Sequence, residues 1–384
     1  MMGEKGKKIS NGVNPLLKID PEKQIKILSL AAISIVSLFL ILVFYSEIKD
    51  TDSYFLAPGK IEPEKNSSSL KTLFLGDIML DRHVGEKISQ KGFPYLLENL
   101  DEKKFFRGYD LISGNLEGAV ADEGAHYKPE MAYDFSFSPE IVSNLKKYNF
   151  NFFNLANNHF ADQGEHGIIE TRKNLETQGF YYSGCQDGQS GDCSGKIIEI
   201  YPVRNDGISN RANGKKIGLA GFSMVYKKLD DEAIKKAIEN LAGQTDIVIV
   251  NIHWGTEYEH RFNKIQQETA HVLVDAGADL IIGHHPHVVQ GLEIYKNKPI
   301  FYSLGNFIFD QYFSSDTQEG LAVGVNIADK KTEFYLYSLK SKLAQPDFMA
   351  EKEKEQFLAN LISWSSLEEN YKEQIKQGKF IIYE

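Results

Sequence analysis

The most strongly apolar segment of the chain lies near its N-terminus and predicts a membrane-spanning helix. From Ile27 to Tyr45 it contains no charged residue, and its polar members are serines. At about 1.5 Å rise per residue, a helix of this length covers the core of a bilayer. A helix buried in a soluble domain would normally carry a polar stripe. A cleaved signal peptide is the other alternative, but the run is long and lacks a small-x-small cleavage site. We therefore predict an uncleaved anchor over residues 27–46.

The charges on either side of this segment predict its orientation. Lysines are frequent before it, whereas the charged residues that follow it are mostly acidic. Because positive flanks stay on the cytoplasmic side, residues 1–26 are expected to form a cytoplasmic tail, and everything after Ser46 is expected outside the cell membrane. Residues 47–69, which contain charges, prolines and serines, are interpreted as a linker.

The rest of the chain alternates short apolar runs with segments of helical period, which is typical of βαβ units. Each apolar run is followed by a polar cluster, often with glycine. Ligands gather at the carboxyl ends of strands in α/β sheets, so these clusters are expected to converge although they are far apart in sequence. The clusters are Gly76-Asp77, Gly114 to Glu117, Asn157 to His159, Phe222-Ser223, His253 to Gly255 and Gly283 to His287.

Capping signals predict three of the intervening helices. Ser138-Pro139 is typical of a helix start, and the segments 230–241 and 264–276 each end close to a glycine. After the last histidine cluster the pattern changes, and residues 292–309 and 320–339 indicate hairpins. A mixed or two-sheet α/β domain over residues 70–343 therefore fits better than a purely parallel one.

The last segment, 344–384, is charged and has a helical period, so it is interpreted as a C-terminal helical appendage. The two cysteines, Cys185 and Cys193, enclose a short polar loop. They are expected to form a hairpin disulfide in an oxidising compartment, with two free thiols as the alternative. The formal net charge of −10 argues against broad nucleic-acid binding. It also disfavours simple capture of an acidic polymer, unless a bound metal reverses the charge locally.

The polar clusters contain the side chains that a hard metal ion prefers, which are oxygen ligands and imidazoles on rigid strand ends. His285 and His287 lie two residues apart, so in an extended segment both imidazoles would face one ion. A carboxylate such as Asp77 or Glu117 would bridge two metals. Each residue alone has a plainer explanation as a cap, a turn or a core histidine, and the prediction depends on their ordered combination. The predicted metal ligands are Asp77, Glu117, Asn158, His253, His285 and His287.

Two residues beside these ligands are candidates for catalysis. His159 would stay off the metal as a general acid or transition-state donor. Arg82 would either bind an anionic substrate group or pair with Asp81. Asn306 is expected either near the site or in a structural turn. The other histidines, with His83 and His260 as possible rim residues, are interpreted as surface or structural.

These motifs, in this order, resemble the CapA family of capsule and poly-γ-glutamate biosynthesis proteins. The resemblance covers residues 70–343 and does not include the tail, the anchor or the C-terminal segment. It implies a four-layer α/β/β/α sandwich similar to calcineurin-like metallophosphoesterases, with one or two divalent ions (Mn, Fe or Zn). The motifs are GDIMLDR at 76–82, NLEG at 115–118, NNHFADQGEHGIIET at 157–171, HWGTEY at 253–258, GADLIIGHHPHVVQ at 277–290 and YSLGNFIFDQ at 302–311.

The resemblance also exposes departures from the phosphoesterase pattern. Met79 stands where that pattern has a histidine, Glu117 replaces a bridging aspartate, and the extra His284 leaves open whether His284 or His285 is the ligand. Two functions therefore remain open. One is a metal-dependent hydrolase of phosphoester or amide bonds. The other is a non-hydrolytic part of a capsule or poly-γ-glutamate synthase or export complex, with synthase subunits and an acidic polymer as partners. A soluble cytoplasmic phosphodiesterase conflicts with the predicted anchor.

Overall fold

The computed structural model describes residues 69–128, 132–201 and 214–383. The chain divides into two units, Met1–Glu62 and Pro63–Glu384, and every described residue belongs to the second. The predicted tail (1–26), the predicted anchor (27–46) and all but the last residue of the predicted linker (47–69) lie outside the described residues. Within the described ranges, none of the helices combines the length and the apolar character that crossing a bilayer requires.

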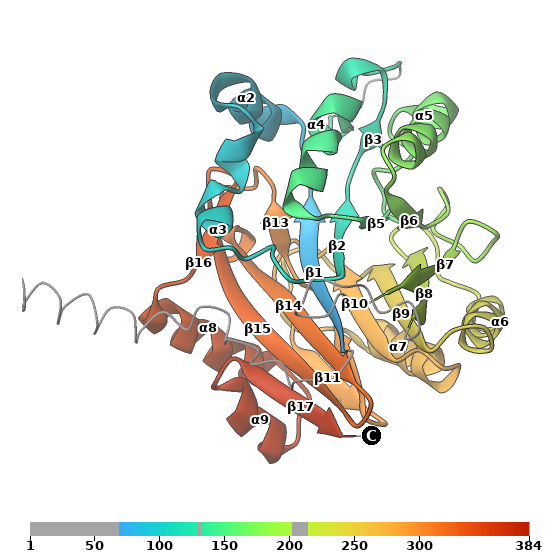
Figure 1. Ribbon diagram of the computed structural model, residues 1–384, viewed down its shortest axis with the longest axis vertical. Coiled ribbons are helices and arrows are strands. Elements are labelled where there is room, and N and C mark those ends of the chain that lie inside the picture. The colour runs from blue at the N-terminus through green and yellow to red at the C-terminus, as the bar shows by residue number, and fades with distance from the viewer. Residues whose placement is uncertain (1–68, 129–131, 202–213, 384) are drawn as a thin grey trace, which may run out of the picture. The chain divides into compact units, whose positions relative to one another are not determined.

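A nine-stranded mixed sheet forms the larger half of the domain (Figure 1). Its order is β16-β15-β14-β1-β2-β5-β6, with β13 beside β1 and β17 beside β15. Strands β1, β2, β5 and β6 are parallel, whereas β14 and β15 form an antiparallel hairpin. The bounds are β1 (Leu70–Ile78), β2 (Leu111–Leu116), β5 (Phe152–Asn154), β6 (Tyr181–Ser183), β13 (Asn306–Ile308), β14 (Glu319–Ala328), β15 (Lys331–Lys342), β16 (Gln345–Phe348) and β17 (Lys379–Tyr383).

A second sheet of six strands has the order β11-β12-β10-β9-β8-β7. Its four central strands are parallel, and both edge strands run antiparallel to their neighbours. The bounds are β7 (Gly195–Ile200), β8 (Lys215–Ser223), β9 (Ile247–His253), β10 (Leu280–His284), β11 (Leu292–Tyr295) and β12 (Lys298–Phe301). A small separate pair is formed by β3 (Ala119–Val120) and β4 (Ser136–Phe137).

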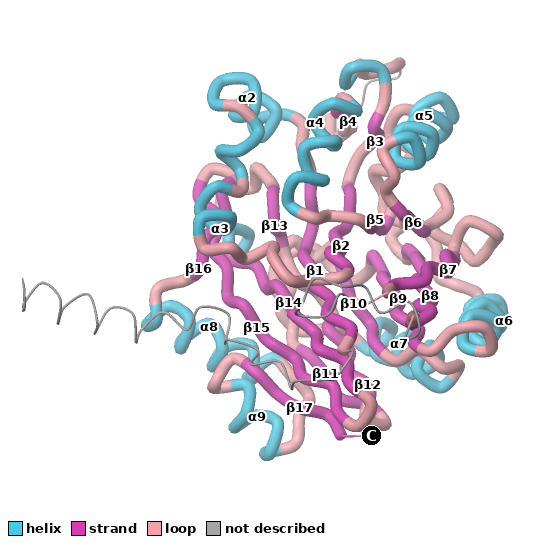
Figure 2. The backbone as a smooth tube through the Cα atoms, viewed as in Figure 1, coloured by secondary structure: helices cyan, strands magenta, loops and turns pink. Residues whose placement is uncertain are grey.

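The helices lie around these strands (Figure 2). Short 3₁₀ segments occur at Phe93–Leu96, Asp122–Gly124, Asn144–Tyr148 and Asp316–Gln318. The α-helices are α2 (Arg82–Lys91), α3 (Glu98–Glu102), α4 (Pro139–Ser143), α5 (Gly164–Thr177), α6 (Asp231–Ala242), α7 (Lys264–Asp275), α8 (Glu351–Trp364) and α9 (Glu369–Ile375).

Three buried apolar clusters explain how these elements pack. Phe74 of β1 belongs to a cluster that fills the space between the two sheets, whereas its neighbours Leu73 and Leu75 belong to a cluster under α2 to α5. This alternation arises because successive side chains of a strand point to opposite faces. A third cluster packs α6 and α7 against the outer face of the six-stranded sheet. The domain is therefore a mixed α/β structure with two packed sheets, whose central strands are apolar on both faces.

The predicted helix starts and hairpins are present. The Ser138 hydroxyl accepts a hydrogen bond from the backbone N–H of Ile141 at 3.3 Å, which caps α4. Asp230 caps α6 by accepting from the backbone N–H of Ala233 at 2.9 Å. The predicted hairpin at 320–339 corresponds to β14–β15. Of the one predicted at 292–309, residues 292–301 form the hairpin β11–β12, whereas Asn306–Ile308 form β13 and pair with β1 in the other sheet. The sequence thus correctly located the elements that lead into the polar clusters.

The C-terminal segment differs from the helical appendage that we expected. It contains α8 and α9, but β16 and β17 pair with the two ends of β15, along the edge that faces away from β14, and extend the large sheet. Phe380 and Ile382 of β17 point into the inter-sheet core, and the Phe380 ring stacks on Phe334 at 4.6 Å. The charged residues of the two helices dominate the pattern of this segment, so the short two-residue period of β17 is easily overlooked.

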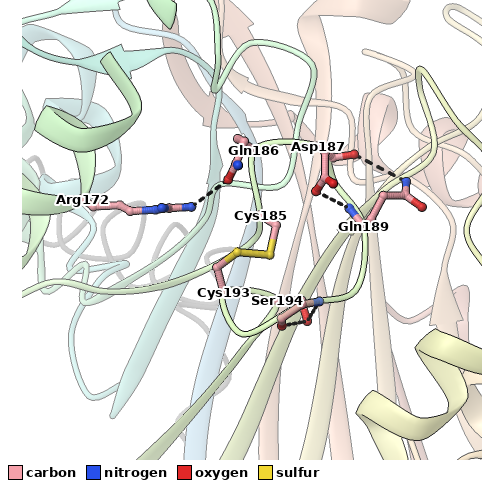
Figure 3. The surroundings of a disulfide bond; sticks show 8 residues. Arg172, Cys185, Gln186, Asp187, Gln189, Cys193 and Ser194 are labelled. Atoms are coloured by element: carbon pink, nitrogen blue, oxygen red, sulfur yellow. Dashed lines mark hydrogen bonds between the residues drawn. A yellow bond between two sulfur atoms is a disulfide. The ribbon is translucent and has the colours of Figure 1, made fainter. Parts of the chain in front are cut away.

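Cys185 and Cys193 form the expected disulfide (Figure 3). It follows β6 and precedes β7, so it closes the connection between the edge strands of the two sheets. The enclosed loop is held to the domain by backbone hydrogen bonds. Gly184 N–H donates to the Cys193 carbonyl at 2.8 Å, and Ser223 N–H, at the end of β8, donates to the Gly188 carbonyl at 2.9 Å. The disulfide therefore secures the edge at which the sheets meet.

Replacing both cysteines with serine is expected to lower the free energy of unfolding by roughly 2.5 kcal/mol, because the unfolded chain gains the freedom of an open loop. The eight-residue sequence separation sets this small value. Urea titration of the full-length variant measures the change, and reduced wild-type protein should behave like the variant. Equal unfolding midpoints for the oxidised and reduced wild type would contradict the expectation.

Candidate metal centre

The polar clusters meet because neighbouring parallel strands end in register. Asp77 of β1 pairs with Asn115 of β2, and His253 of β9 pairs with His284 of β10. Glu117 follows β2 by one residue. The β1 backbone also contacts the chain that precedes β13, where Asp77 N–H donates to the Gly305 carbonyl at 3.0 Å. A Cβ on Gly76 would lie 1.9 Å from this carbonyl oxygen, so only glycine permits the approach.

Asn115 lies at the centre of the cluster. Its Nδ2 is 2.9 Å from Asp77 Oδ1, 3.0 Å from Glu117 Oε1 and 3.2 Å from His253 Nδ1. Its Oδ1 accepts a hydrogen bond from Asn154 Nδ2 at 2.9 Å, which fixes the amide with its nitrogen toward the carboxylates. The sequence analysis did not identify this role. The signal was present, since Asn115 and Asn154 are amide residues at or next to the ends of buried strands.

Two carboxylates are fully buried in the cluster and make it suitable for a cation. Burial raises the pKa of Glu117, and the negative charge of Asp77 raises it further. Burial would also raise the pKa of Asp77, but hydrogen bonds and charge interactions with His284 and His287 outweigh it and hold that pKa well below its usual value. Glu117 Oε2 is buried and has no hydrogen-bond partner among the residues that the structure describes. A divalent cation would satisfy this oxygen and relieve the repulsion between the two carboxylates, so the residues present fit such an ion.

The imidazoles converge on the same place. His253 Nε2 lies 3.1 Å from His285 Nδ1 and 2.7 Å from Asn158 Oδ1. Burial lowers the pKa of His253 well below its usual value. Burial, together with the charge of His287, lowers the pKa of His285 to about 4. Both imidazoles are therefore neutral near pH 7, which is the form that binds metal ions.

Two groups of described residues are arranged so that they can hold a metal ion. In each group the possible ligand atoms lie within 4.8 Å of one another. The first group is Asp77, Glu117 and His287, and the second is Glu257, His285 and His287. His287 belongs to both. Glu257 was not among the sequence candidates; its position four residues after His253, in the same motif, was the available signal.

The backbone conformation that brings His285 and His287 to the site was not predicted from the sequence. We expected His285 and His287 to face one ion because they lie in an extended segment, and this explanation is wrong. Both residues have positive φ, 96° and 57°. The left-handed conformation is uncommon outside glycine. With it, the His287 side chain lies near Asp77 and Glu117, and both imidazoles lie near Glu257. His284 contacts other buried polar side chains through both ring nitrogens: Nδ1 lies 3.3 Å from Asp77 Oδ1 and Nε2 lies 3.4 Å from Asn251 Oδ1. His285, but not His284, belongs to a candidate ligand group, so the arrangement favours His285 as the ligand.

Met79, at the position where the phosphoesterase pattern has a histidine, is fully buried in the cluster under the helices. Its sulfur accepts a hydrogen bond from the backbone N–H of Asp81 at 3.1 Å. This position therefore contributes no imidazole to the candidate metal site. Asn306, by contrast, reaches the site, because its Oδ1 is 3.0 Å from His287 Nδ1.

A cavity of about 750 Å³ opens beside the cluster, and it contains both candidate catalytic residues. His159 Nδ1 is 2.8 Å from Asp162 Oδ2, and the His159 ring packs against Phe135 at 4.1 Å. Asn158 and His287 also line the cavity, which places its inner end at the candidate ligands. The His159–Asp162 pair leaves the His159 Nε2 available to a bound molecule.

Arg82 does not pair with Asp81, and this alternative from the sequence is wrong. Its guanidinium forms a two-point ion pair with Asp310, in which Nε lies 3.1 Å from Oδ2. The Asp81 carboxylate instead accepts hydrogen bonds from two backbone N–H groups, that of Arg82 at 2.6 Å and that of Ser136 at 2.8 Å. Asp81 thereby caps α2 and holds β4 in place. Arg82 thus lines the cavity, but its charge is largely compensated.

The fold and the site together describe a two-sheet α/β protein with a buried carboxylate–imidazole cluster at its strand ends, and this cluster contains groups that could hold a metal ion. Residues 71–311 match the family described as "Bacterial capsule synthesis protein PGA_cap", and the chain belongs to that family. The resemblance to CapA proteins is confirmed.

The chain is similar to curated proteins with matching names. It is 31% identical over 312 residues to the "Capsule biosynthesis protein CapA" of Bacillus anthracis, which covers 76% of this chain and 71% of the relative. It is 33% identical over 279 residues to the "PGA biosynthesis protein CapA" of Bacillus subtilis (strain 168), with 67% and 69% covered. A "Probable polyglutamine synthesis accessory protein" of Mycobacterium tuberculosis is 24% identical over 291 residues, with 64% and 76% covered.

Proposed function

We propose that this chain is a membrane-anchored extracytoplasmic protein that acts in capsule or poly-γ-glutamate biosynthesis or export through a divalent-metal site. The observation that carries the proposal is the buried Asp77–Glu117–His287 group with its unpartnered Glu117 oxygen. Family membership and the names of the relatives support the process. The layering of two sheets between helices supports a calcineurin-like metallophosphoesterase type of fold.

The residues of the chain have distinct tasks in this proposal. Asp77, Glu117, Asn158, His253, His285 and His287 would hold one or two ions of Mn, Fe or Zn, whose preference for mixed oxygen and imidazole ligands matches this set. When bound, the ion supplies Lewis-acid polarisation of a carbonyl or phosphoryl oxygen. Asn115 orients both carboxylates. His159, held by Asp162, moves a proton at its Nε2, and the rings of Phe135 and Phe309, which line the cavity, would limit the access of water to its inner end.

The His159–Asp162 pair specifically favours a second candidate, a metal-dependent hydrolase of phosphoester or amide bonds at the cell surface. A carboxylate that holds one ring nitrogen and leaves the other free toward a cavity is the arrangement of a general acid or base. A purely scaffolding site would have no use for it. Incubating the full-length protein with phosphoesters and γ-glutamyl amides distinguishes the two candidates, since only the hydrolase releases products.

The membrane location follows from the sequence alone and is part of the proposal. Residues 27–46 would anchor the chain, with the N-terminus cytoplasmic and the domain outside, in contact with other synthase subunits and an acidic polymer. The disulfide supports an oxidising location. Recovery of the full-length chain in the soluble fraction without detergent would contradict the anchor.

The process is tested in a bacterium that lacks its own copy of this gene. The full-length wild type is expected to restore the surface polymer. An Asp77→Asn variant, which keeps the size of the side chain but removes its charge, is expected to restore less than about one tenth, since losing one direct ligand weakens metal binding at least as much as losing an outer-shell partner. The matched control is Asp81→Asn, outside the ligand set, with equal protein levels checked by immunoblot. Full restoration by Asp77→Asn would contradict the proposal.

A further inference from the structure

The buried carboxylates of the candidate metal centre are separated from the cavity by other side chains. Asp77 and Glu117 are both 0% exposed, and neither lines the cavity. Asn158 and His287 do line it and lie at its inner end. A metal ion that comes from solvent must therefore pass these side chains before it reaches the two carboxylates, and a buried metal site needs such an entry path.

A second set of possible ligands lies along this path. Glu257 is exposed and lines the cavity, and its carboxylate forms a candidate ligand group with His285 and His287. We call Glu257, His285 and His287 the outer group, and Asp77, Glu117 and His287 the inner group. His287 belongs to both groups, so it borders both positions. Ligand atoms are therefore available all the way from the cavity to the buried carboxylates.

The loop that carries Glu257 is fixed to the histidine turn by backbone hydrogen bonds. On one side of Glu257, the Trp254 N–H donates to the His284 carbonyl at 3.0 Å. On the other side, the Tyr258 N–H donates to the Pro286 carbonyl at 2.8 Å, and Tyr258 has a φ of 66°. Because the loop is held at both ends, the Glu257 carboxylate stays beside the imidazoles although it is exposed.

The acids that line the cavity differ in their partners. Asp310 is paired with Arg82, and Asp162 Oδ2 is 2.8 Å from His159 Nδ1. Neither acid belongs to a candidate ligand group, whereas Glu257 does. Negative charge at an entrance attracts a cation and raises its rate of association. A bound cation in turn offsets the charge of the buried carboxylates, which is compatible with an acidic polymer as a later ligand.

We propose that the outer group captures a divalent ion from solvent and passes it to the inner group, with Glu257 as the entry ligand. This inference rests on the proposed function, because it describes how the metal site of that function is filled. Asp77 and Glu117 replace Glu257 and His285 around the ion, while His287 borders it throughout. The inner group holds the ion more tightly, because it has two carboxylates in a place without water and the outer group has one exposed carboxylate.

The variant Glu257→Gln distinguishes an entry ligand from a ligand of the final site. An entry ligand speeds exchange in both directions. Its removal should therefore slow the uptake of Mn²⁺ and the release of Mn²⁺ by the same factor, about 10-fold, which is the lower end of the range for charge-assisted capture. The equilibrium affinity and the metal content should stay as in the wild type. Loss of a final ligand would instead weaken the affinity and speed the release.

Stopped-flow mixing of the full-length protein in detergent measures both rates. Metal-free protein is mixed with Mn²⁺ in the presence of a fluorescent indicator of free Mn²⁺, and loaded protein is mixed with excess EDTA. Glu259→Gln is the matched control, because Glu259 is exposed on the same loop but neither lines the cavity nor belongs to a ligand group. Its rates should equal those of the wild type. Asp77→Asn should show the contrasting result, a weaker equilibrium affinity.

The outcomes separate this inference from the proposed function. Wild-type rates in Glu257→Gln, or faster release with weaker affinity, would overturn the entry role of Glu257 and leave the metal site itself intact. A folded wild-type protein that takes up no Mn²⁺ would overturn the proposed function, whatever the variants show.

Discussion

A full-length variant with His253→Ala and His287→Ala is expected to lose its bound divalent metal. His287 belongs to both candidate ligand groups. His253 Nε2 lies 3.1 Å from Nδ1 of His285, which belongs to the second group, so the two changes affect the ligands of both groups. Outer-shell partners of a metal contribute about 10- to 100-fold each to its affinity, and direct ligands contribute at least as much. Loss of two direct ligands should therefore weaken binding by at least about 100-fold.

Elemental analysis after dialysis, followed by titration with Mn²⁺ and Zn²⁺, measures this change. His271→Ala is the control, because His271 lies on α7 and its Nε2 is 3.2 Å from Glu293, outside the cluster. The control should bind metal like the wild type. A double variant that is folded and retains full metal content would show that the ion is bound elsewhere.

His159→Gln is expected to reduce any hydrolytic turnover by about 100-fold or more while leaving the metal in place. General acid–base groups typically contribute 10²- to 10⁴-fold, and glutamine keeps a polar side chain without titrating. The His159 Nδ1 contacts Asp162 at 2.8 Å and no candidate ligand, so metal content should not change. Turnover of the most reactive phosphoester or γ-glutamyl amide substrate, at saturating metal, is the measurement.

His126→Gln provides the comparison for this variant. His126 also contacts carboxylates, with its nitrogens 3.1 Å from Asp81 and 3.0 Å from Asp134, but it does not line the cavity. Turnover in this control should stay within a small factor of the wild type. If the His159→Gln variant turned over substrate as fast as the His126→Gln control, His159 would be a structural residue and the hydrolase candidate would lose its main support.

Much of this arrangement was predictable because it depends on local patterns. In β1 an apolar run is followed by the polar pair Gly76-Asp77. This pattern predicts a buried strand with a carboxylate at its carboxyl end. The same holds for β9 with His253 and for β10 with the histidine cluster. The cysteine pair was predictable for a similar reason, since its short spacing restricts the geometry.

The features that escaped prediction depend on contacts between distant segments. The position of Asn115 among Asp77, Glu117 and His253 requires the register of β1 against β2 and the approach of the second sheet. The pairing of Arg82 with Asp310 joins residues 228 positions apart. The positive φ of His285 and His287 has no signature in the letters of the sequence. Such relations follow from packing, which no single window of sequence contains.

The most direct test of the metal site is the anomalous scattering of crystals of the full-length protein soaked with Mn²⁺. Our account predicts a peak at the Mn absorption edge within bonding distance, about 2.0–2.6 Å, of atoms of Asp77, Glu117 and His287, with any second peak near His285. No peak within that distance of these residues, in crystals that carry Mn²⁺ elsewhere, would contradict the account.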